Sequence, residues 1–275
     1  MPSPFENAVP PAPAGTPKPP EEARLAIFDA GVTSHVLSRR AVTCADGRRH
    51  LLFLAVPTKP APPSGFPLLS MLDGNAAFDA LTPELLAAVP GLALAGIGYD
   101  TTLRFDRAAR ALDYTPPRHG ESGGADAFLD RLLTELLPEA ARALPVDAGR
   151  RSLWGHSLAG LCALYALLAR PGTFSRIVAA SPSLWWGDEF LLALEERTPA
   201  EACGRTEILV MLGDSERRSS PSGPHWQGPA PHTLEMVHRL GLRDGLEISC
   251  RVFEGAGHAA TLPASLPSAL EFAAR

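Results

Sequence analysis

The pattern of apolar and polar positions changes character several times along the chain. Two early runs, 32–43 and 48–56, alternate between apolar and polar residues and are separated by Asp46-Gly47, which is typical of a β-hairpin. Beyond residue 65, short apolar runs typical of buried strands are followed by segments with helical periodicity. The runs that predict strands are 66–72, 92–98, a short stretch starting at 151, 177–180, 207–212 and 246–253. The segments that predict helices are 83–89, 126–143, 161–168, 189–196, 233–241 and the stretch after Pro263.

The alternation of strands and helices sets the expected fold class. Successive parallel strands need a long crossover connection, and a helix between them supplies it. The pattern predicts about eight strands, of which the first two form a hairpin and most of the others are parallel. We therefore expect an α/β fold with a mostly parallel sheet of about eight strands and helices on both faces.

Proline sets the amino-terminal segment apart from the rest. Residues 1–20 contain eight prolines among small and polar residues. Such a composition cannot form a helix and offers little apolar surface to bury. We expect a disordered arm over 1–20 and one α/β domain over 21–275.

Composition narrows the classes of function. The chain has 275 residues, of which 45% are hydrophobic, enough to build a substantial core. Its formal net charge of −5 argues against a nucleic-acid partner. No apolar run is long enough to cross a bilayer, and the amino terminus lacks the basic start and apolar block of a signal peptide. We therefore expect a cytoplasmic protein without a membrane span.

The cysteines do not indicate a metal site. Cys44, Cys162, Cys203 and Cys250 form no C-x-x-C pair, and no histidine lies at a spacing suited to zinc. Three of the four lie in apolar contexts, which is typical of buried free thiols. We expect neither a metal nor an organic cofactor.

One stretch combines a strand, a sharp turn and a helix around a serine. Small residues stand two positions before and two positions after Ser157, at Gly155 and Ala159. They are needed because a nucleophilic serine on such a turn has a strained backbone close to the neighbouring strand and helix. The next helix points its amino end at the serine, so the Leu158 N–H is a candidate oxyanion donor. The pattern predicts a nucleophile elbow with Ser157 as the nucleophile.

A histidine after the last predicted strand is the candidate general base. In the α/β-hydrolase fold, the catalytic residues follow in the order serine, acid, histidine. His258 ends the string Gly255-Ala256-Gly257-His258, which follows the strand 246–253. The glycines would let the imidazole reach Ser157, and the other seven histidines have no such placement.

Two carboxylates follow the strand 207–212, where the acid of a triad is expected. Asp214 and Glu216 could each orient His258 and stabilise its imidazolium form. Glu216 is favoured because it lies three residues after Gly213, a common spacing for the acid in this fold. Asp214 stays as the alternative, and the carboxylate that is not the acid would stabilise a turn, which suits aspartate.

The loop after the strand 66–72 is the expected source of a second oxyanion donor. Asp73-Gly74-Asn75 occupies this loop, and the backbone N–H of Asn75 is the candidate. The same tripeptide also suits a plain turn. Losing one such donor typically costs about 3 to 4 kcal/mol of transition-state stabilisation.

From about residue 32 onward, several strings resemble one family. They are Leu72 to Asp79, Gly96-Ile97-Gly98-Tyr99, the segment 107–117 with Asp113-Tyr114-Thr115-Pro116, the elbow, and Ser181-Pro182-Ser183-Leu184-Trp185-Trp186. Together they resemble the putative-esterase branch of the α/β-hydrolases, and within it the enterobactin and salmochelin type of siderophore esterase. Ala159 departs from the glycine usual at its position, and the Pro/Gly-rich segment 219–231 bears on the mouth of the pocket.

The resemblance implies a serine esterase that hydrolyses a trilactone scaffold carrying catecholates, with or without bound iron. It also places a substrate-binding arginine at Arg107. Guanidinium groups and indole faces suit an anionic aromatic ligand such as a ferric tris-catecholate. Beside Arg107, the candidate contacts are Trp185, Trp186, Trp226, Arg104, Arg110, Arg118, Arg217 and Arg218. Each arginine also suits a solvated surface, and Trp185-Trp186 also suits a core.

Two alternatives remain at this point. A general carboxylesterase acting on acetyl or feruloyl esters would use the same triad and differ only in substrate preference. A binding module without activity is disfavoured, because Ser157, His258 and two acids are all in place.

Overall fold

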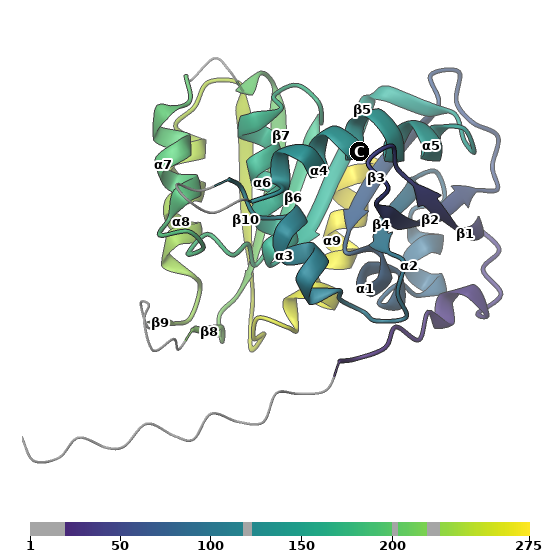
Figure 1. Ribbon diagram of the computed structural model, residues 1–275, viewed down its shortest axis with the longest axis horizontal. Coiled ribbons are helices and arrows are strands. Elements are labelled where there is room, and N and C mark those ends of the chain that lie inside the picture. The colour runs from purple at the N-terminus through teal and green to yellow at the C-terminus, as the bar shows by residue number, and fades with distance from the viewer. Residues whose placement is uncertain (1–19, 118–122, 200–202, 219–225) are drawn as a thin grey trace, which may run out of the picture.

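The computed structural model describes residues 20–117, 123–199, 203–218 and 226–275, so the arm expected over 1–20 lies, except for Pro20, outside the described residues (Figure 1). Within these ranges, one sheet has eight strands in the order β1-β2-β4-β3-β5-β6-β7-β10. β2 pairs antiparallel with both β1 and β4, and the other pairs are parallel. The strands are β1 (His35–Thr43), β2 (Arg49–Pro57), β3 (Phe66–Leu72), β4 (Ala93–Tyr99), β5 (Val146–His156), β6 (Arg176–Ala180), β7 (Thr206–Gly213) and β10 (Leu246–Phe253).

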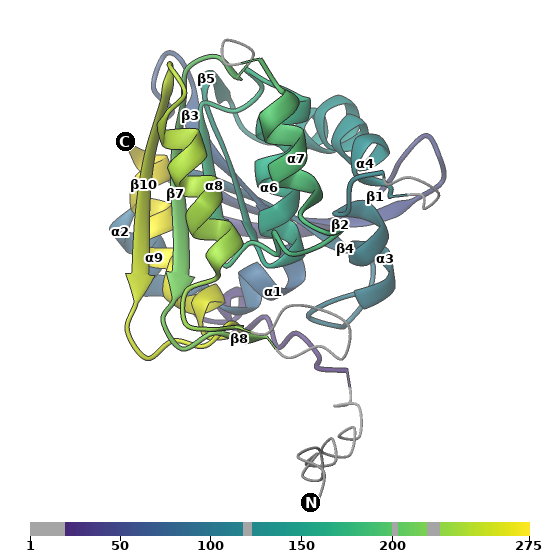
Figure 2. The same cartoon turned by 90° about the vertical axis from the view of Figure 1, so that its left-hand side faces the viewer.

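Helices cover both faces of the sheet (Figure 2), which confirms the expected fold class. One layer holds η1, α1, α2 and α9, and the other holds α4, α6, α7 and α8. The helices are η1 (Ala26–Phe28), α1 (Gly74–Asp79), α2 (Pro83–Ala88), α3 (Arg107–Asp113), α4 (Ala125–Arg131), η2 (Leu132–Leu136), α5 (Leu137–Ala141), α6 (Leu158–Ala169), α7 (Phe190–Arg197), α8 (Pro231–Gly241) and α9 (Thr261–Ala274). None of these helices is long and apolar enough to cross a membrane, within the part of the chain that the structure describes.

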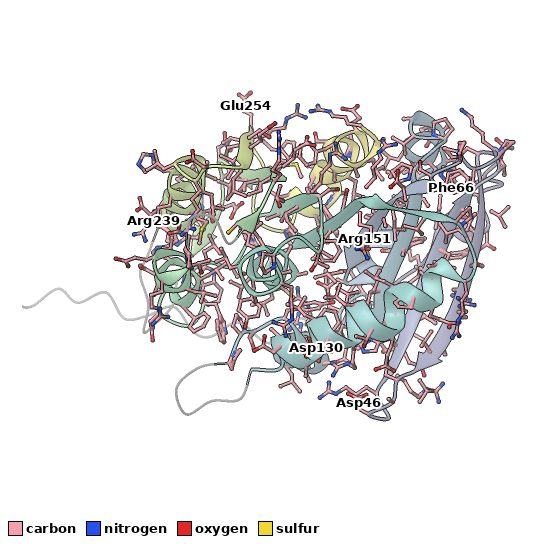
Figure 3. All side chains as sticks on the ribbon, turned by 90° about the horizontal axis from the view of Figure 1, so that it is seen from above. Asp46, Phe66, Asp130, Arg151, Arg239 and Glu254 are labelled. Atoms are coloured by element: carbon pink, nitrogen blue, oxygen red, sulfur yellow. The ribbon has the colours of Figure 1, made fainter. Side chains whose placement is uncertain are left out.

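Burial follows the apolar pattern of each strand. Every residue of β3 and β4 is buried, as expected for central strands covered on both faces. β1, at the edge, alternates between buried or half-buried and exposed positions over much of its length. Seen from above, side chains fill the space between the sheet and its helices (Figure 3).

The parallel strands bring the candidate catalytic loops to one edge of the sheet. β3, β5, β6, β7 and β10 run in the same direction, so the loops at their carboxyl ends share that edge. Asp73 follows β3, Ser157 follows β5, Glu216 follows β7 and His258 follows β10.

The segment just after Pro20 runs beside the loop that follows β4. Ala23 N–H donates to Thr102 O at 2.9 Å, and Arg104 N–H donates to Glu21 O at 2.8 Å. An isolated antiparallel bridge links residues 22 and 103. The amino-terminal segment is therefore attached to the active-site edge, although its sequence carries no strand pattern.

Candidate active site

Ser157 stands on a sharp turn between β5 and α6. Its backbone has φ 61° and ψ −120°, a strained conformation for a residue with a side chain. Its N–H donates to Ala180 O on β6 at 3.0 Å. A Cβ at Gly155 would lie 2.2 Å from Ala159 O, so only glycine fits there. This geometry is that of a nucleophile elbow.

His258 reaches the serine from the loop after β10. Its Nε2 lies 2.9 Å from Ser157 Oγ. This is a hydrogen-bond distance, so the imidazole can accept the serine proton as a general base. Gly255 has φ 68°, a left-handed turn that glycine adopts without strain. The loop thereby places the imidazole over the elbow.

Glu216 lies on the other side of the imidazole. Its Oε2 is 3.4 Å from His258 Nδ1, and its Oε1 accepts a hydrogen bond from Gly213 N–H at 2.8 Å. The residue is 1% exposed. Burial alone would raise the pKa of Glu216, but hydrogen bonds from His258, Ser181 and Gly213 hold this pKa below its ordinary value of 4.5. The carboxylate is thus kept ionised beside the histidine.

Asp214 has a different place. Its Oδ1 accepts from Gly255 N–H at 2.8 Å and from Ser215 Oγ at 2.9 Å, and its own N–H donates to Phe253 O. These bonds tie the loop after β7 to the loop after β10. Of the two acids that the sequence leaves open, the structure places Glu216 on His258 and Asp214 between the loops.

The two candidate oxyanion donors lie at helix starts. Leu158 is the first residue of α6, and Asn75 is the second residue of α1. The first amide groups of a helix have no acceptor inside it. The Asn75 side chain accepts from Tyr99 N–H at 2.9 Å and donates to Thr101 O at 3.0 Å, which fixes α1 against the end of β4.

A cavity of about 260 Å³ opens above the serine. Its floor holds the elbow and His258, and its walls carry three arginines from the segment 104–110. The lining residues are Glu21, Arg104, Phe105, Arg107, Arg110, His156, Ser157, His258, Ala259 and Leu262. The structure therefore brings Arg107 together with Ser157 and His258, as the sequence predicts.

A buried ion pair anchors the wall of this cavity. Arg110 binds Asp73 through Nε at 3.0 Å and through Nη2 at 2.7 Å. Asp73, 2% exposed, has φ 51°, and its N–H donates to Tyr114 Oη at 2.9 Å. The pair joins α3 to the end of β3, so it fixes how α3 faces the cavity.

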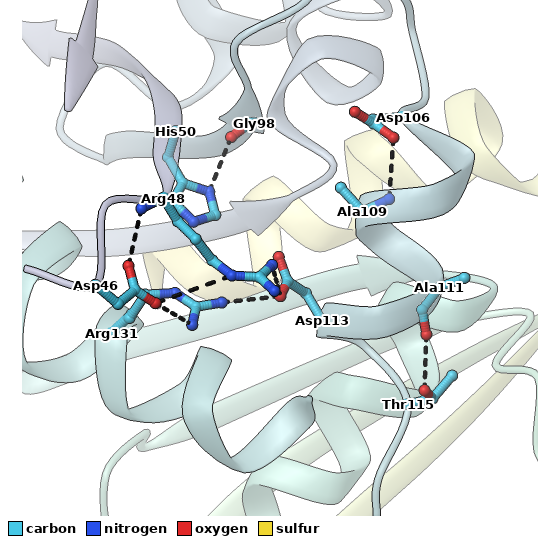
Figure 4. Close-up of polar contacts among 10 residues, drawn as sticks. All are labelled: Asp46, Arg48, His50, Gly98, Asp106, Ala109, Ala111, Asp113, Thr115 and Arg131. Atoms are coloured by element: carbon cyan, nitrogen blue, oxygen red, sulfur yellow. Dashed lines mark hydrogen bonds and ion pairs between the residues drawn. The ribbon is translucent and has the colours of Figure 1, made fainter. Parts of the chain in front are cut away.

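A second side of α3 faces another group of charges. Asp113, at the end of α3, accepts hydrogen bonds from Arg48 at 3.0 Å and from Arg131 at 2.8 Å (Figure 4). Nearby, His50 Nδ1 donates to Gly98 O at 3.2 Å, and burial lowers the pKa of His50. Asp106 Oδ1 accepts from Ala109 N–H and caps the start of α3. The helix is therefore held from both sides.

The three predicted tryptophans lie outside the described lining of the Ser157 cavity. The guanidinium of Arg218 lies 3.3 Å from the centroid of the Trp185 ring, and Trp226 pairs with Arg218 in the ribbon of β8 (Arg217–Arg218) and β9 (Trp226–Gln227). Trp186 is half-buried and packs against the sheet core. Arg118 and most of the segment 219–231 fall outside the described residues.

The sequence did not single out several residues of the site. His156 Nε2 lies 2.8 Å from His258 O, and since a carbonyl only accepts, this nitrogen carries the proton. Burial and the neighbouring His258 lower the pKa of His156 to about 3, so its ring stays neutral. The position of His156 directly before Ser157 could have indicated that it belongs to the site. Nothing in the sequence indicated that Glu21 lines the cavity. Ser183 Oγ lies 3.2 Å from Ser157 Oγ, and its only signal was the string that carries Trp185-Trp186.

Several known proteins are similar to this chain in sequence and fold. The family model described as putative esterase matches residues 47–265. The apo-salmochelin esterase of Escherichia coli O6:H1 is 34% identical, over 89% of this chain and 81% of the relative. The ferri-bacillibactin esterase BesA of Bacillus subtilis is 29% identical, over 83% of this chain and 86% of the relative. A solved structure of the enterobactin hydrolase IroE in complex with DFP superposes with a TM-score of 0.76 at 32% identity, over 90% of this chain and 98% of that one.

These matches agree with the site. The family model covers more than half of the chain, including the elbow, both acids and His258. The chain is thus a serine ester hydrolase with the α/β-hydrolase fold, and it belongs to the putative esterase family.

Proposed function

We propose that this enzyme hydrolyses the ester bonds of a catecholate siderophore, a trilactone of the enterobactin or salmochelin type, free or with bound iron. The observation that carries the proposal is the hydrogen-bonded line from Ser157 through His258 to Glu216 beneath a wall of arginines. The names of the relatives, all esterases or hydrolases of siderophores, support the substrate class.

The proposed chemistry is acyl transfer in two steps. Ser157 Oγ attacks the ester carbonyl while its proton passes to His258 Nε2, and Glu216 stabilises the imidazolium. The amides of Leu158 and Asn75 would hold the oxyanion. Collapse expels the alcohol, which takes the proton from His258. Water, deprotonated by the same histidine, then attacks the acyl-enzyme. The bond between the acyl carbon and Ser157 Oγ breaks, Ser157 takes the proton back from His258, and the carboxylic acid is released.

Charge at the cavity supports an anionic substrate. Arg104 is paired with Asp79 and Glu21, and Arg110 is paired with Asp73. Arg107 is exposed and, within the described residues, has no acidic partner. We propose that Arg107 binds the catecholate oxygens, with Trp185, Trp186 and Trp226 as further contacts outside the immediate cavity.

The test is hydrolysis of enterobactin, with and without ferric iron, compared with p-nitrophenyl acetate and a feruloyl ester. We expect a much higher kcat/KM for the trilactone, and Ser157→Ala should abolish turnover without changing the fold. Arg107→Ala should raise KM for the trilactone while leaving p-nitrophenyl acetate hydrolysis unchanged, because the small neutral ester carries no charge for the guanidinium to bind.

Two results would count against the proposal. Turnover of the simple esters alone would leave the triad in place but remove the siderophore as substrate. Esterase activity retained by Ser157→Ala would contradict the nucleophile itself.

A further inference from the structure

The tripeptide Ser181-Pro182-Ser183 follows β6 and contacts both ends of the proposed triad. Ser181 Oγ lies 2.5 Å from Glu216 Oε1, and Ser183 Oγ lies 3.2 Å from Ser157 Oγ. Both serines are 2% exposed. Ser183 N–H also donates to Ser157 O at 3.1 Å. One short segment therefore touches the acid, the nucleophile and the backbone of the elbow.

The backbone of Ser181 is held in a conformation that favours glycine. Its φ is 43°, in the left-handed region where a side chain causes strain. Its N–H donates to Met211 O on β7 at 2.7 Å, and the ring of Pro182 restricts the backbone of the residue before it, which is Ser181 itself. A glycine would fit here without strain, so the serine side chain has a use that offsets the cost.

Charge fixes the direction of the hydrogen bond at the acid. An ionised carboxylate only accepts, so the hydroxyl of Ser181 donates to Glu216 Oε1. Thr261 Oγ1 lies 2.6 Å from Ser181 Oγ and 2.7 Å from His258 O. Thr261 has a single hydroxyl hydrogen, which can serve only one of these two contacts, so the two buried hydroxyls lie between the Glu216 carboxylate and the backbone of His258 without forming a continuous chain of hydrogen bonds.

The direction of the hydrogen bond between Ser183 and Ser157 follows from the number of hydroxyl hydrogens. The single hydroxyl hydrogen of Ser157 must point to His258 Nε2 for the histidine to accept it. The hydrogen in the contact between the two serines then belongs to Ser183. A donor at this position stabilises the negative charge that builds on Ser157 Oγ as its proton leaves.

We infer that Ser181 is a positioning residue that holds Glu216 ionised and facing His258, and that Ser183 is a catalytic donor to Ser157 Oγ. The inference rests on the proposed triad and adds two residues to it. It also gives the Ser-Pro-Ser string a function in catalysis, whereas the tryptophans that follow are candidates for substrate binding.

Among the residues that the structure describes, few ionisable groups surround Glu216. His258 faces its Oε2. His156 interacts electrostatically with the Glu216 carboxylate, but its ring stays neutral because burial lowers the pKa of His156 to about 3. Asp214 and Arg217 flank Glu216 on its own loop, where Asp214 binds Gly255 and Ser215. A change at Ser181 should therefore be seen chiefly in the titration of the His258–Glu216 pair.

The test is the rate of inactivation by diisopropyl fluorophosphate, measured against pH. The reagent phosphorylates Ser157 with loss of fluoride while His258 takes the proton, so no siderophore is needed. Ser181→Ala should move the acid midpoint upward by about one pH unit, because losing a donor raises the proton affinity of the pair. Ser183→Ala should lower the plateau rate by about tenfold and leave the midpoint in place.

Controls separate the hydroxyl from the fold. Ser181→Gly removes the same hydroxyl and suits φ 43°, so a shift shared with Ser181→Ala comes from the hydroxyl. Ser215→Ala changes an exposed serine that binds Asp214 and should behave as wild type. Circular dichroism reports whether each variant is folded.

An unchanged midpoint in both Ser181 variants, or an unchanged plateau in Ser183→Ala, overturns the inference. Ser157→Ala must give no covalent adduct. An adduct on that variant would contradict the proposed function instead, so the two failures are distinguishable.

Discussion

At the scale of single residues, two carboxylates two positions apart do different work. Glu216 faces His258 from a buried site, whereas Asp214 binds the Gly255 N–H and joins two loops. The longer side chain reaches the histidine because Gly213 lets the loop turn close to its neighbour, where a Cβ would lie 1.9 Å from Ala256 O. The choice between the acids thus depends on a contact between two loops.

This difference predicts very different effects on kcat for substitutions at the two carboxylates. Glu216→Gln should lower kcat by about 10³- to 10⁴-fold, because the amide cannot stabilise the imidazolium. Asp214→Asn keeps an acceptor for Gly255 N–H and should change kcat by no more than about twofold. Steady-state kinetics on p-nitrophenyl acetate measures both. A larger loss in Asp214→Asn than in Glu216→Gln would reverse the assignment.

At the scale of elements, α3 is the part of the site that depends most on packing. One side carries Arg107 and Arg110 toward the cavity, and the other ends in Asp113 among Arg48 and Arg131. The helix has only seven residues, too short to be stable alone. Its orientation therefore comes from the charges that hold it on both sides.

The ion pair between Asp73 and Arg110 should be costly to break. Asp73→Asn leaves a largely buried guanidinium without its charge partner, so the free energy of unfolding should fall by about 3 kcal/mol. Asp100→Asn is the control, since it disrupts an exposed pair with Arg49 and should cost less than about 1 kcal/mol. Urea unfolding compares the two, and equal losses would show that the buried pair does not anchor α3.

Most elements follow from the sequence, and the exceptions have physical causes. The strand 66–72 is found with the predicted bounds, and the helix predicted over 126–143 is observed as α4, η2 and α5. α1 was missed because Asp73-Gly74-Asn75 suits a turn, and the bonds between Asn75 and β4 that fix it are tertiary. The Ser157 and His258 positions follow from motif order. The roles of Ser181 and Thr261 beside them could not be predicted, because these two side chains meet only in the folded protein and are 80 positions apart in the sequence.

At the scale of the whole molecule, the fold keeps several histidines neutral. His35, His50 and His156 come from β1, β2 and β5, and each is at most 5% exposed. Burial is the largest cause that lowers the pKa of all three. The unfolded chain would protonate them near pH 6.5, whereas in the folded chain their protonation needs a more acidic solution.

Stability should therefore fall as the pH drops below 6.5. For His156, with a folded pKa of about 3, the loss between pH 7.5 and 5.5 should be about 1.4 kcal/mol, with His35 and His50 adding to it. Glu216 acts below this window, because its pKa is lowered from 4.5 and its contribution is lost only under more acidic conditions. Urea unfolding at the two pH values, on wild type and His156→Gln, measures the effect. A pH dependence equal in both proteins would exclude His156 as a source.

The attachment of residues 21–23 to the loop 102–104 has a practical consequence for anyone who handles the protein. Glu21 belongs to the cavity wall, so a tag or fusion partner joined directly to Pro20 would start beside the mouth of the cavity. The carboxyl end lies beside Arg150, in the first half of β5, whereas Ser157 follows the last residue of that strand. Immobilising or labelling the enzyme there leaves the entrance clear.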